Sequence, residues 1–236
     1  MKKLLLAILI AFTLPAYSKS ITATSWLVAD GFSNIIQSEN VDEVRPIASI
    51  SKLMAVMVVL DADQNPTTVI AGFTREQRIT MALVKSDNNS AKLLCDYYPG
   101  GKLACITAMN NKAQELGMTH THFIEPTGLS VFNVSTAREL IKLVDAASTY
   151  PSILTASASP SVKIHMKKRW LIVYNTNPII GKRHKFLVSK TGYIHASGGC
   201  IVMMLDTDIG RRIVIVLGSK NTRTRIPEAE FIAESY

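Results

Sequence analysis

Segments with the pattern of β-strands lie near both ends of this 236-residue chain, and segments with the pattern of helices lie between them. Near the N-terminus, Ser25–Ala29 and Ile35–Gln37 flank turn residues 30–34, which predicts a hairpin. We therefore predict an α/β fold of the α+β type, in which the two ends of the chain build one antiparallel sheet flanked by helices, with an inserted helical cluster. The strands expected near the C-terminus are Leu187–Lys190, Gly199–Leu205 and Arg212–Leu217, with a hairpin loop at 206–210.

The helices between these strands are predicted from apolar spacing and from helix-end signals. Gly117 ends one of them, and Ser135 or Thr136 is a suitable N-cap for another. The chain has no internal repeat and no low-complexity linker, so residues 19–236 are expected to form a single domain. The predicted helices are Ser49–Ala62, Arg75–Val84, Asn89–Tyr97, Leu103–Leu116, Thr136–Ala147 and a closing helix at Pro227–Ser235.

The first 18 residues have the three parts of an export signal. Lys2 and Lys3 precede an apolar run from Leu4 to Leu14, and small residues stand at the −3 and −1 positions of a cut after Ser18. A run of 11 residues is too short to span a bilayer comfortably. We expect cleavage near Ser18, which leaves an exported protein, periplasmic or secreted, without a stable membrane anchor.

The composition favours anionic surroundings. The chain has 26 basic and 18 acidic side chains, a formal net charge of +8, which suits a cell envelope or a nucleic acid. Basic residues gather at 163–169 and 182–185, but no nucleic-acid-binding module is recognisable and export argues against one, so no nucleic-acid partner is expected. CxxC, HExxH and phosphate-loop patterns are missing, and the histidines show no ligand spacing beyond the weak pair His120 and His122, so no metal and no cofactor are predicted.

Two of the three cysteines are placed to form a disulfide, which export permits. Cys95 and Cys105 flank the helix-stop and turn residues 97–101. If the flanking segments are antiparallel helices, the two thiols can meet, and we propose a Cys95–Cys105 bridge. Two buried free thiols are the alternative. Cys200 lies in an apolar strand, where a thiol of the core is expected.

One motif places a serine and a lysine on the same face at the start of the first long helix. Ser49 and Lys52 are three residues apart, and S-x-x-K occurs nowhere else in the chain. A serine hydroxyl becomes a nucleophile when a base takes its proton, and a lysine amine can do so when its pKa is lowered. A helix N-terminus and a second cation would both lower that pKa. A lone match is more often a helix cap followed by a solvated lysine.

Two further motifs are weak when taken alone. Ser86-Asp87-Asn88 lies between two predicted helices, where a polar turn is the ordinary interpretation. Lys190-Thr191-Gly192 ends a predicted strand, where a lysine often protects a sheet edge. Its glycine would allow a ligand to approach closely, and its lysine and threonine could seat a carboxylate. The order S-x-x-K, S-x-N, K-T-G in an exported chain outweighs the three ordinary interpretations.

With these motifs, the sequence resembles the low-molecular-mass penicillin-binding proteins of the D-alanyl-D-alanine carboxypeptidase and endopeptidase family, and most closely their endopeptidase branch. The resemblance covers essentially the whole mature chain and implies a DD-peptidase/β-lactamase-like fold. Besides the three motifs, it is carried by segments 45–54, 97–101, 125–130, 133–138 and 175–177 and by Tyr193.

The resemblance implies a serine-type peptidase that acts on peptidoglycan peptides and is inhibited by β-lactams. Ser49 would attack a carbonyl next to D-alanine, and Lys52 would be the general base. Ser86 would relay a proton toward the leaving amine, and Asn88 would position Lys52 and the substrate amide. Water would then release the acyl-enzyme.

The resemblance also implies the groups that hold the substrate. Lys190 and Thr191 would bind its terminal carboxylate, with Gly192 completing the motif. The backbone N–H groups of Ser49 and Tyr193 would form an oxyanion hole. Arg225 is a further candidate partner for the carboxylate.

The sequence departs from the family pattern in three ways. The stretch between Ser51 and Ser86 is shorter than usual, so a surface element beside the site is expected to be missing. Gly199 stands where relatives usually carry a larger residue. The chain ends after its last predicted helix, without the β-domain and amphipathic anchor of the carboxypeptidase branch, which favours the endopeptidase branch.

Other functions stay open from the sequence alone. A β-lactamase needs a carboxylate for fast deacylation, and the E-x-x-L-N segment of class A enzymes is missing here. A catalytically idle wall-binding or β-lactam-sensing module has no need of a nucleophile and a base together. Carboxypeptidase and endopeptidase activities use the same residues, so the sequence does not separate them.

Overall fold

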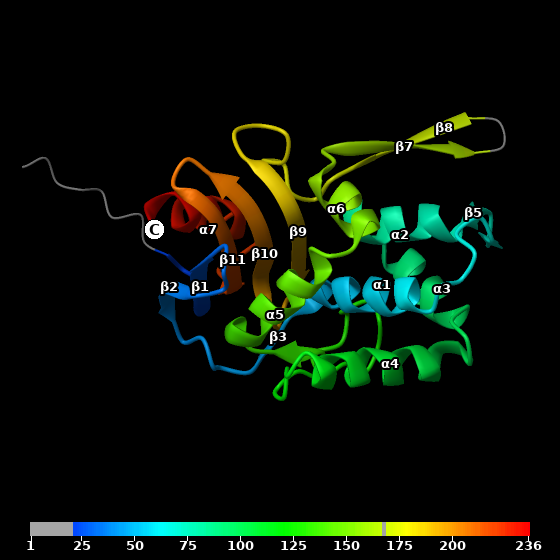
Figure 1. The fold of residues 1–236 in the computed structure, drawn as a ribbon, viewed down its shortest axis with the longest axis horizontal. Coiled ribbons are helices and arrows are strands. Elements are labelled where there is room, and N and C mark those ends of the chain that lie inside the picture. Colours follow the sequence, from blue (N-terminus) through cyan, green and yellow to red (C-terminus); the bar gives the residue numbers. More distant parts are fainter. Residues whose placement is uncertain (1–20, 167–168) are drawn as a thin grey trace, which may run out of the picture.

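The computed structural model describes residues 21–166 and 169–236, and the proposed signal at 1–18 lies outside these ranges. A five-stranded antiparallel sheet has the order β2-β1-β11-β10-β9, so strands from the two ends of the chain lie side by side (Figure 1). The predicted sheet is therefore confirmed. Its strands are β1 (Ser25–Asp30), β2 (Ile35–Glu39), β9 (Lys185–Ile194), β10 (Gly198–Thr207) and β11 (Gly210–Ser219).

Helices cover both faces of this sheet (Figure 1). The closing helix α7 (Arg225–Ser235) packs on β10 and β11, while α5 and α6 pack on the opposite face. Because successive side chains of a strand point to opposite faces, Leu27 belongs to the core under the helical cluster and Val28 to the core under α7. The other helices are α1 (Ser51–Asp61), α2 (Arg75–Val84), α3 (Asn88–Asp96), α4 (Gly101–Glu115), α5 (Ala137–Ala147) and α6 (Pro151–Ala158).

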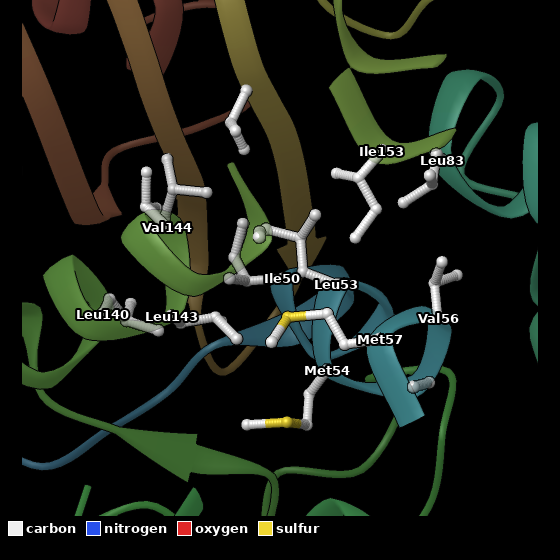
Figure 2. Packing of buried hydrophobic residues seen from close by; sticks show 14 of the residues in the cluster. Ile50, Leu53, Met54, Val56, Met57, Leu83, Leu140, Leu143, Val144 and Ile153 are labelled. Atoms are coloured by element: carbon white, nitrogen blue, oxygen red, sulfur yellow. The ribbon is translucent and has the colours of Figure 1, made fainter. Parts of the chain in front are cut away.

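Helix α1 is the centre of the helical cluster. Its side chains from Ser51 to Val59 are buried on every face, as expected for a helix that is apolar all round. Figure 2 shows Leu53, Met54 and Met57 of α1 among apolar side chains of α5, α6 and α2. This packing holds the N-terminal end of α1 at the sheet.

Short paired elements complete the fold. A 3₁₀ turn, η1 (Ala48–Ile50), precedes α1, and four two-residue strands form two small ladders. These strands are β3 (Arg45–Pro46) with β6 (Val134–Ser135), and β4 (Val69–Ile70) with β5 (Phe73–Thr74).

Several boundaries differ from the sequence prediction. The helix at Arg75–Val84 is confirmed at both ends and begins with a capping box between Thr74 and Gln77. The next helix begins at Asn88 rather than at residue 89, because Asp87 accepts a hydrogen bond from Ser90 N as its N-cap. The hairpin loop predicted at 206–210 is shorter, because β10 and β11 stay paired up to Thr207 and Gly210.

The sequence prediction missed one helix, the hairpin that follows it and the four two-residue strands. Helix α6 follows α5 after a short turn, with Pro151 at its first position. It leads into β7 (Ser161–Met166) and β8 (Arg169–Tyr174), which pair with each other outside the main sheet. Lys163 and Arg169, at the two ends of the basic stretch, lie in β7 and β8, and polar and apolar residues alternate from Ser161 to Met166. We interpreted that stretch only by its charge, so the alternation was overlooked.

The cysteines divide as the sequence proposed. A disulfide joins Cys95, near the end of α3, to Cys105 in α4, with the Cα atoms 5.3 Å apart. Cys200 is a buried free thiol in β10. Within the described residues, none of the helices combines the length and the apolar character that crossing a membrane requires.

Candidate active site

Ser49 and Lys52 meet at the N-terminal end of α1. Ser49 is half-buried and lies in the turn η1, not in the first turn of the helix as predicted. The turn begins at Ala48, whose φ of +47° is a left-handed conformation that is rare outside glycine. The Lys52 Nζ atom is 2.7 Å from Ser49 Oγ, so the predicted pair is formed despite the different backbone.

The Lys52 amine is completely buried and has three acceptors. It donates to Ser49 Oγ, to Asn88 Oδ1 at 2.7 Å and to the carbonyl oxygen of Thr127. Burial lowers the pKa of Lys52 to about 8, against the opposing charges of Glu125 and Asp87. The lowering was predicted, but its main cause is desolvation rather than a helix terminus or a second cation. The neutral form of the amine is therefore accessible near pH 8.

The S-x-N motif forms the expected turn between α2 and α3. Ser86 has a φ of +60°, a second left-handed residue at the site. Asp87 stabilises this turn as the N-cap of α3. The result is that Asn88, the first residue of α3, faces Lys52, while Ser86 Oγ accepts a hydrogen bond from Lys190 Nζ at 2.8 Å.

The K-T-G motif lies within β9, not at a strand end as predicted, because β9 continues to Ile194. Lys190 is only 1% exposed, so it does not protect a sheet edge. Its amine donates to Ser86 Oγ and to the Thr191 carbonyl oxygen, each at 2.8 Å. Burial, helped by the charges of Lys52 and Arg225, lowers the pKa of Lys190 well below its usual value.

The glycine of this motif accommodates the chain itself. A Cβ atom on Gly192 would lie 2.9 Å from Ser49 N and 3.1 Å from the Ile47 carbonyl oxygen. We expected a ligand to approach Gly192 closely, but the backbone of η1 occupies that space. This contact places β9 against the turn that carries Ser49. Arg225 supports the strand from α7, since its guanidinium donates to the Gly192 carbonyl oxygen at 2.6 Å.

Two contributors to the site were not assigned a role from the sequence. The Thr127 carbonyl accepts hydrogen bonds from Lys52 Nζ and, at 3.3 Å, from Ser49 Oγ. The Thr191 hydroxyl donates to Thr176 Oγ1 at 2.6 Å, which ties β9 to the loop after β8. The Thr127 carbonyl is a backbone group, which no residue type signals, and Thr176 lies outside the three motifs. Only the resemblance of segments 125–130 and 175–177 to the family pointed to these two residues.

The turn that carries Thr127 requires a glycine. Gly128 has a φ of +79°, and a Cβ atom there would lie 1.9 Å from the Ala48 carbonyl oxygen and 2.7 Å from Ser49 N. We expect Gly128→Ala to destabilise the fold by about 2 kcal/mol or more and to lower Tm by about 4–8 °C. Differential scanning calorimetry measures this. Gly72→Ala is the matched control, because Gly72 has a φ of +86° but nothing within 4 Å of its Cβ position. An equal Tm loss in both variants would mean that backbone conformation, and not the contact with η1, decides the cost.

A carboxylate-containing cluster lies apart from this site. The donor atoms of His184, Glu230 and Glu234 lie within 4.8 Å of one another. Arg183 donates to Glu234 Oε1 at 2.7 Å and so supplies the positive charge that a cation would bring. We therefore assign no metal to this cluster.

The arrangement has the parts needed for nucleophilic catalysis. A hydroxyl on Ser49 lies next to an amine with a lowered pKa, and a second hydroxyl, on Ser86, contacts a second buried amine. The backbone of η1 lies beside β9, an edge strand of the sheet. Because the nucleophile is half-buried while both amines are buried, a substrate carbonyl can reach Ser49 without contact between water and the amines.

Comparison with known proteins gives a consistent assignment. A family model described as D-alanyl-D-alanine carboxypeptidase matches residues 13–71 and 68–221. A D-alanyl-D-alanine endopeptidase of Escherichia coli (strain K12) is 40% identical over 80% of this chain and 68% of its own length. A D-alanyl-D-alanine endopeptidase of Pseudomonas aeruginosa is 34% identical over 92% of this chain and 77% of its own length.

Solved structures agree in fold. Penicillin-binding protein D2 from Listeria monocytogenes, in its cefotaxime-bound form, superposes with a TM-score of 0.80 and 26% identity, covering 91% of this chain and 97% of that one. The Streptomyces K15 DD-transpeptidase gives a TM-score of 0.85 at 22% identity, with the same coverage of both chains, and supports the fold alone.

Proposed function

Because this chain belongs to the D-alanyl-D-alanine carboxypeptidase family, we propose that it is a serine-type peptidase that hydrolyses the bond next to a D-alanine in peptidoglycan peptides. The observation that carries this proposal is the contact of Lys52 Nζ with Ser49 Oγ at 2.7 Å, with the pKa of Lys52 lowered to about 8. A neutral amine at that distance is a general base for the hydroxyl.

The first half of the reaction uses Ser49 and Lys52. The Ser49 proton passes to Lys52 Nζ while Oγ bonds to the D-alanine carbonyl carbon. The N–H groups of Ser49 and Tyr193 are the proposed donors to the resulting oxyanion. Neutral Lys52 keeps two N–H groups, which match the acceptors on Asn88 and Thr127, and its lone pair then faces Ser49.

The second half releases the leaving amine and restores the enzyme. Ser86 passes a proton to the amine nitrogen as the C–N bond breaks and regains one from Lys52, which carries the proton taken from Ser49, while Lys190 holds the Ser86 hydroxyl. Water then hydrolyses the ester on Ser49 and regenerates the hydroxyl. A β-lactam would enter by the same route, with its amide bond opened and its acyl group left on Ser49.

The positive charge of β9 is the proposed seat of the substrate carboxylate. Lys190 is too buried to wrap around a ligand, but in its protonated form it raises the potential beside Thr191, Gly192 and the half-exposed Tyr193. Arg225 adds charge behind Gly192 and is held there by the carbonyl of that residue. We propose that Arg225 acts by its field and by supporting β9.

We infer that cross-links are the preferred substrate, since relatives named endopeptidases reach 40% and 34% identity. Carboxypeptidase action on an uncross-linked peptide is the second candidate, supported by a 27% identical carboxypeptidase of Mycobacterium tuberculosis. We also propose export, on the basis of residues 1–18, which would bring the enzyme to the wall.

A single experiment tests the function. The mature protein is incubated with a fluorescent penicillin, and the adduct is mapped by peptide mass; purified muropeptides are then digested. We expect a stable adduct on the peptide that spans Ser49 and cleavage of cross-linked dimers to monomers. Release of terminal D-alanine alone would identify a carboxypeptidase. Rapid penicillin turnover without an adduct would indicate a β-lactamase, and neither adduct nor turnover in folded protein would indicate a binding module.

A further inference from the structure

The carboxylate of Glu125 organises the turn beside the catalytic pair. Its Oε2 atom accepts hydrogen bonds from the N–H and the hydroxyl of Thr127, each at 2.6 Å. Its Oε1 atom accepts from Gly128 N at 2.6 Å and from Ser130 N at 3.3 Å. A carboxylate has about four acceptor positions, and this turn uses all of them. The conformation of residues 125–130 therefore depends on one side chain.

That turn presents the Thr127 carbonyl to the catalytic pair. The carbonyl oxygen accepts from Lys52 Nζ and from Ser49 Oγ, which makes it a shared acceptor of the base and the nucleophile. The start of the turn is anchored to α1, because Asn133 Nδ2 donates to the Glu125 carbonyl at 2.8 Å and to Ser51 Oγ at 2.9 Å. A displaced Thr127 carbonyl would let the Lys52 amine turn away from Ser49.

The charge of Glu125 also acts on the amine. Three charged groups act on or beside Lys52: Glu125 in the turn, Asp87 at the start of α3 and Lys190 in β9. The two carboxylates favour protonated Lys52 and so oppose the effect of burial on its pKa. Lys190 is a cation when protonated, unlike these two carboxylates, and the charge of Lys52 lowers the pKa of Lys190.

We propose that Glu125 is a positioning residue for acylation, which fixes the Thr127 carbonyl that orients Lys52 toward Ser49 and sets the charge balance at this amine. The inference rests on the proposed function. Glu125 lies outside the three sequence motifs and two residues before Thr127, whose carbonyl makes the contact with Lys52. Its part is to hold that carbonyl in place.

The test compares Glu125→Gln with the wild type. A glutamine keeps one carbonyl oxygen, but its NH₂ group faces the donors of the other oxygen, so two of the four hydrogen bonds are lost. The acylation rate constant with fluorescent penicillin is measured from pH 6 to pH 10. We expect the plateau rate to fall about 10-fold to 100-fold, as misplacement of a catalytic group does.

The pH profile separates positioning from mere loosening. In the wild type, the rate should rise with pH through the Lys52 pKa of about 8. Removing the Glu125 charge removes a group that favours the protonated amine, so the rise should move to lower pH. A turn that had simply become loose would admit water to Lys52, relieve its desolvation and move the rise to higher pH.

Glu139→Gln is the matched control. Glu139 is also buried, 5% exposed, and also organises a loop, since it accepts from His120 N at 2.9 Å and from the Thr121 hydroxyl at 2.6 Å. Glu139 is not one of the charged groups that shift the pKa of Lys52. We expect this variant to lose thermal stability and to keep the pH profile of the wild type. A Glu125→Gln variant with the same profile as this control would overturn the proposal.

Two further measurements keep the outcomes distinct. Glu125→Asp retains the charge but shortens the side chain, so the rate should fall without a shift of the profile. The Lys52 pKa can also be followed by NMR of ¹³C-labelled lysine, which needs no acylation. Wild-type protein that forms no adduct contradicts the proposed function. If the wild type does form the adduct but Glu125→Gln has the same Lys52 pKa as the wild type, only the role of Glu125 is contradicted.

Discussion

Ser49→Ala is expected to form no penicillin adduct and to lose hydrolysis of cross-linked muropeptides by a factor on the order of 10⁴–10⁶. The acyl-enzyme needs the Oγ atom, and the neighbouring hydroxyls cannot replace it. Ser86 Oγ is held by Lys190, and Ser51 Oγ donates to the Ala48 carbonyl at 2.9 Å on the buried side of the turn. Gel fluorescence and chromatography of the digested muropeptides measure the two losses.

Ser51→Ala is the matched control for this substitution. Ser51 lies two residues from Ser49 and is fully buried, and it accepts from Asn133 Nδ2 at 2.9 Å. Its hydroxyl makes two hydrogen bonds, so its loss should cost about 2 kcal/mol of stability, at about 1 kcal/mol each, and leave the adduct in place. An adduct that persists in Ser49→Ala, or that disappears only in Ser51→Ala, would mean that Ser49 is not the nucleophile and would reject the mechanism.

Lys52→Met should lower the acylation rate constant by about 10²–10⁴-fold, the contribution typical of a general base. Methionine has a similar length and no basic nitrogen, so the Ser49 proton has no acceptor of comparable strength. The decisive readout is the pH profile. The wild-type rate should rise through pH 8 as Lys52 loses its proton, and the variant should lack that rise.

The same variant should retain its fold. The folded-state pKa of Lys52, about 8, is below the unfolded value of 10.5, so the unfolded chain holds more protons between these values. Burial of the charged amine therefore costs stability below pH 8, and this cost disappears as the pH rises toward 10.5. Methionine removes the cost and also removes the Lys52 donor of Asn88 Oδ1 and of the Thr127 carbonyl, of which the carbonyl keeps Ser49 Oγ as a second donor. We expect a Tm close to that of the wild type at pH 7; a large loss of Tm together with a normal profile would make Lys52 structural.

Local patterns were sufficient for much of the fold. Continuous apolar runs in β1 and β11 predicted strands, and the capping pair Thr74 and Gln77 agrees with a helix whose ends were predicted correctly. Helix α6 and the β7–β8 hairpin were missed for different reasons. The helix is short and begins directly after the turn that ends α5. The hairpin, which packs on α2, was missed because its basic residues were interpreted only by their charge.

The candidate site was partly visible in the sequence. The spacing of Ser49 and Lys52 survives the change from a helical turn to a 3₁₀ turn, because both bring residues three apart to one side. The interpretation of Lys190 as the end of a strand was wrong, since β9 extends through Ile194 by pairing with Gly198 of β10. Strand length depended on the partner strand and not on the apolar run alone.

The sequence by itself determined which side chains could do chemistry: a serine with a lysine three residues on, a polar S-x-N turn and a single K-T-G, in an order typical of one class of enzymes. Only the tertiary structure decided how they act. It buries Lys52 and Lys190, and so lowers the pKa of both, and it brings the Thr127 carbonyl and the Glu125 carboxylate to the same amine. Desolvation and backbone hydrogen bonds depend on segments distant in the chain, and no spacing of residue types encodes them.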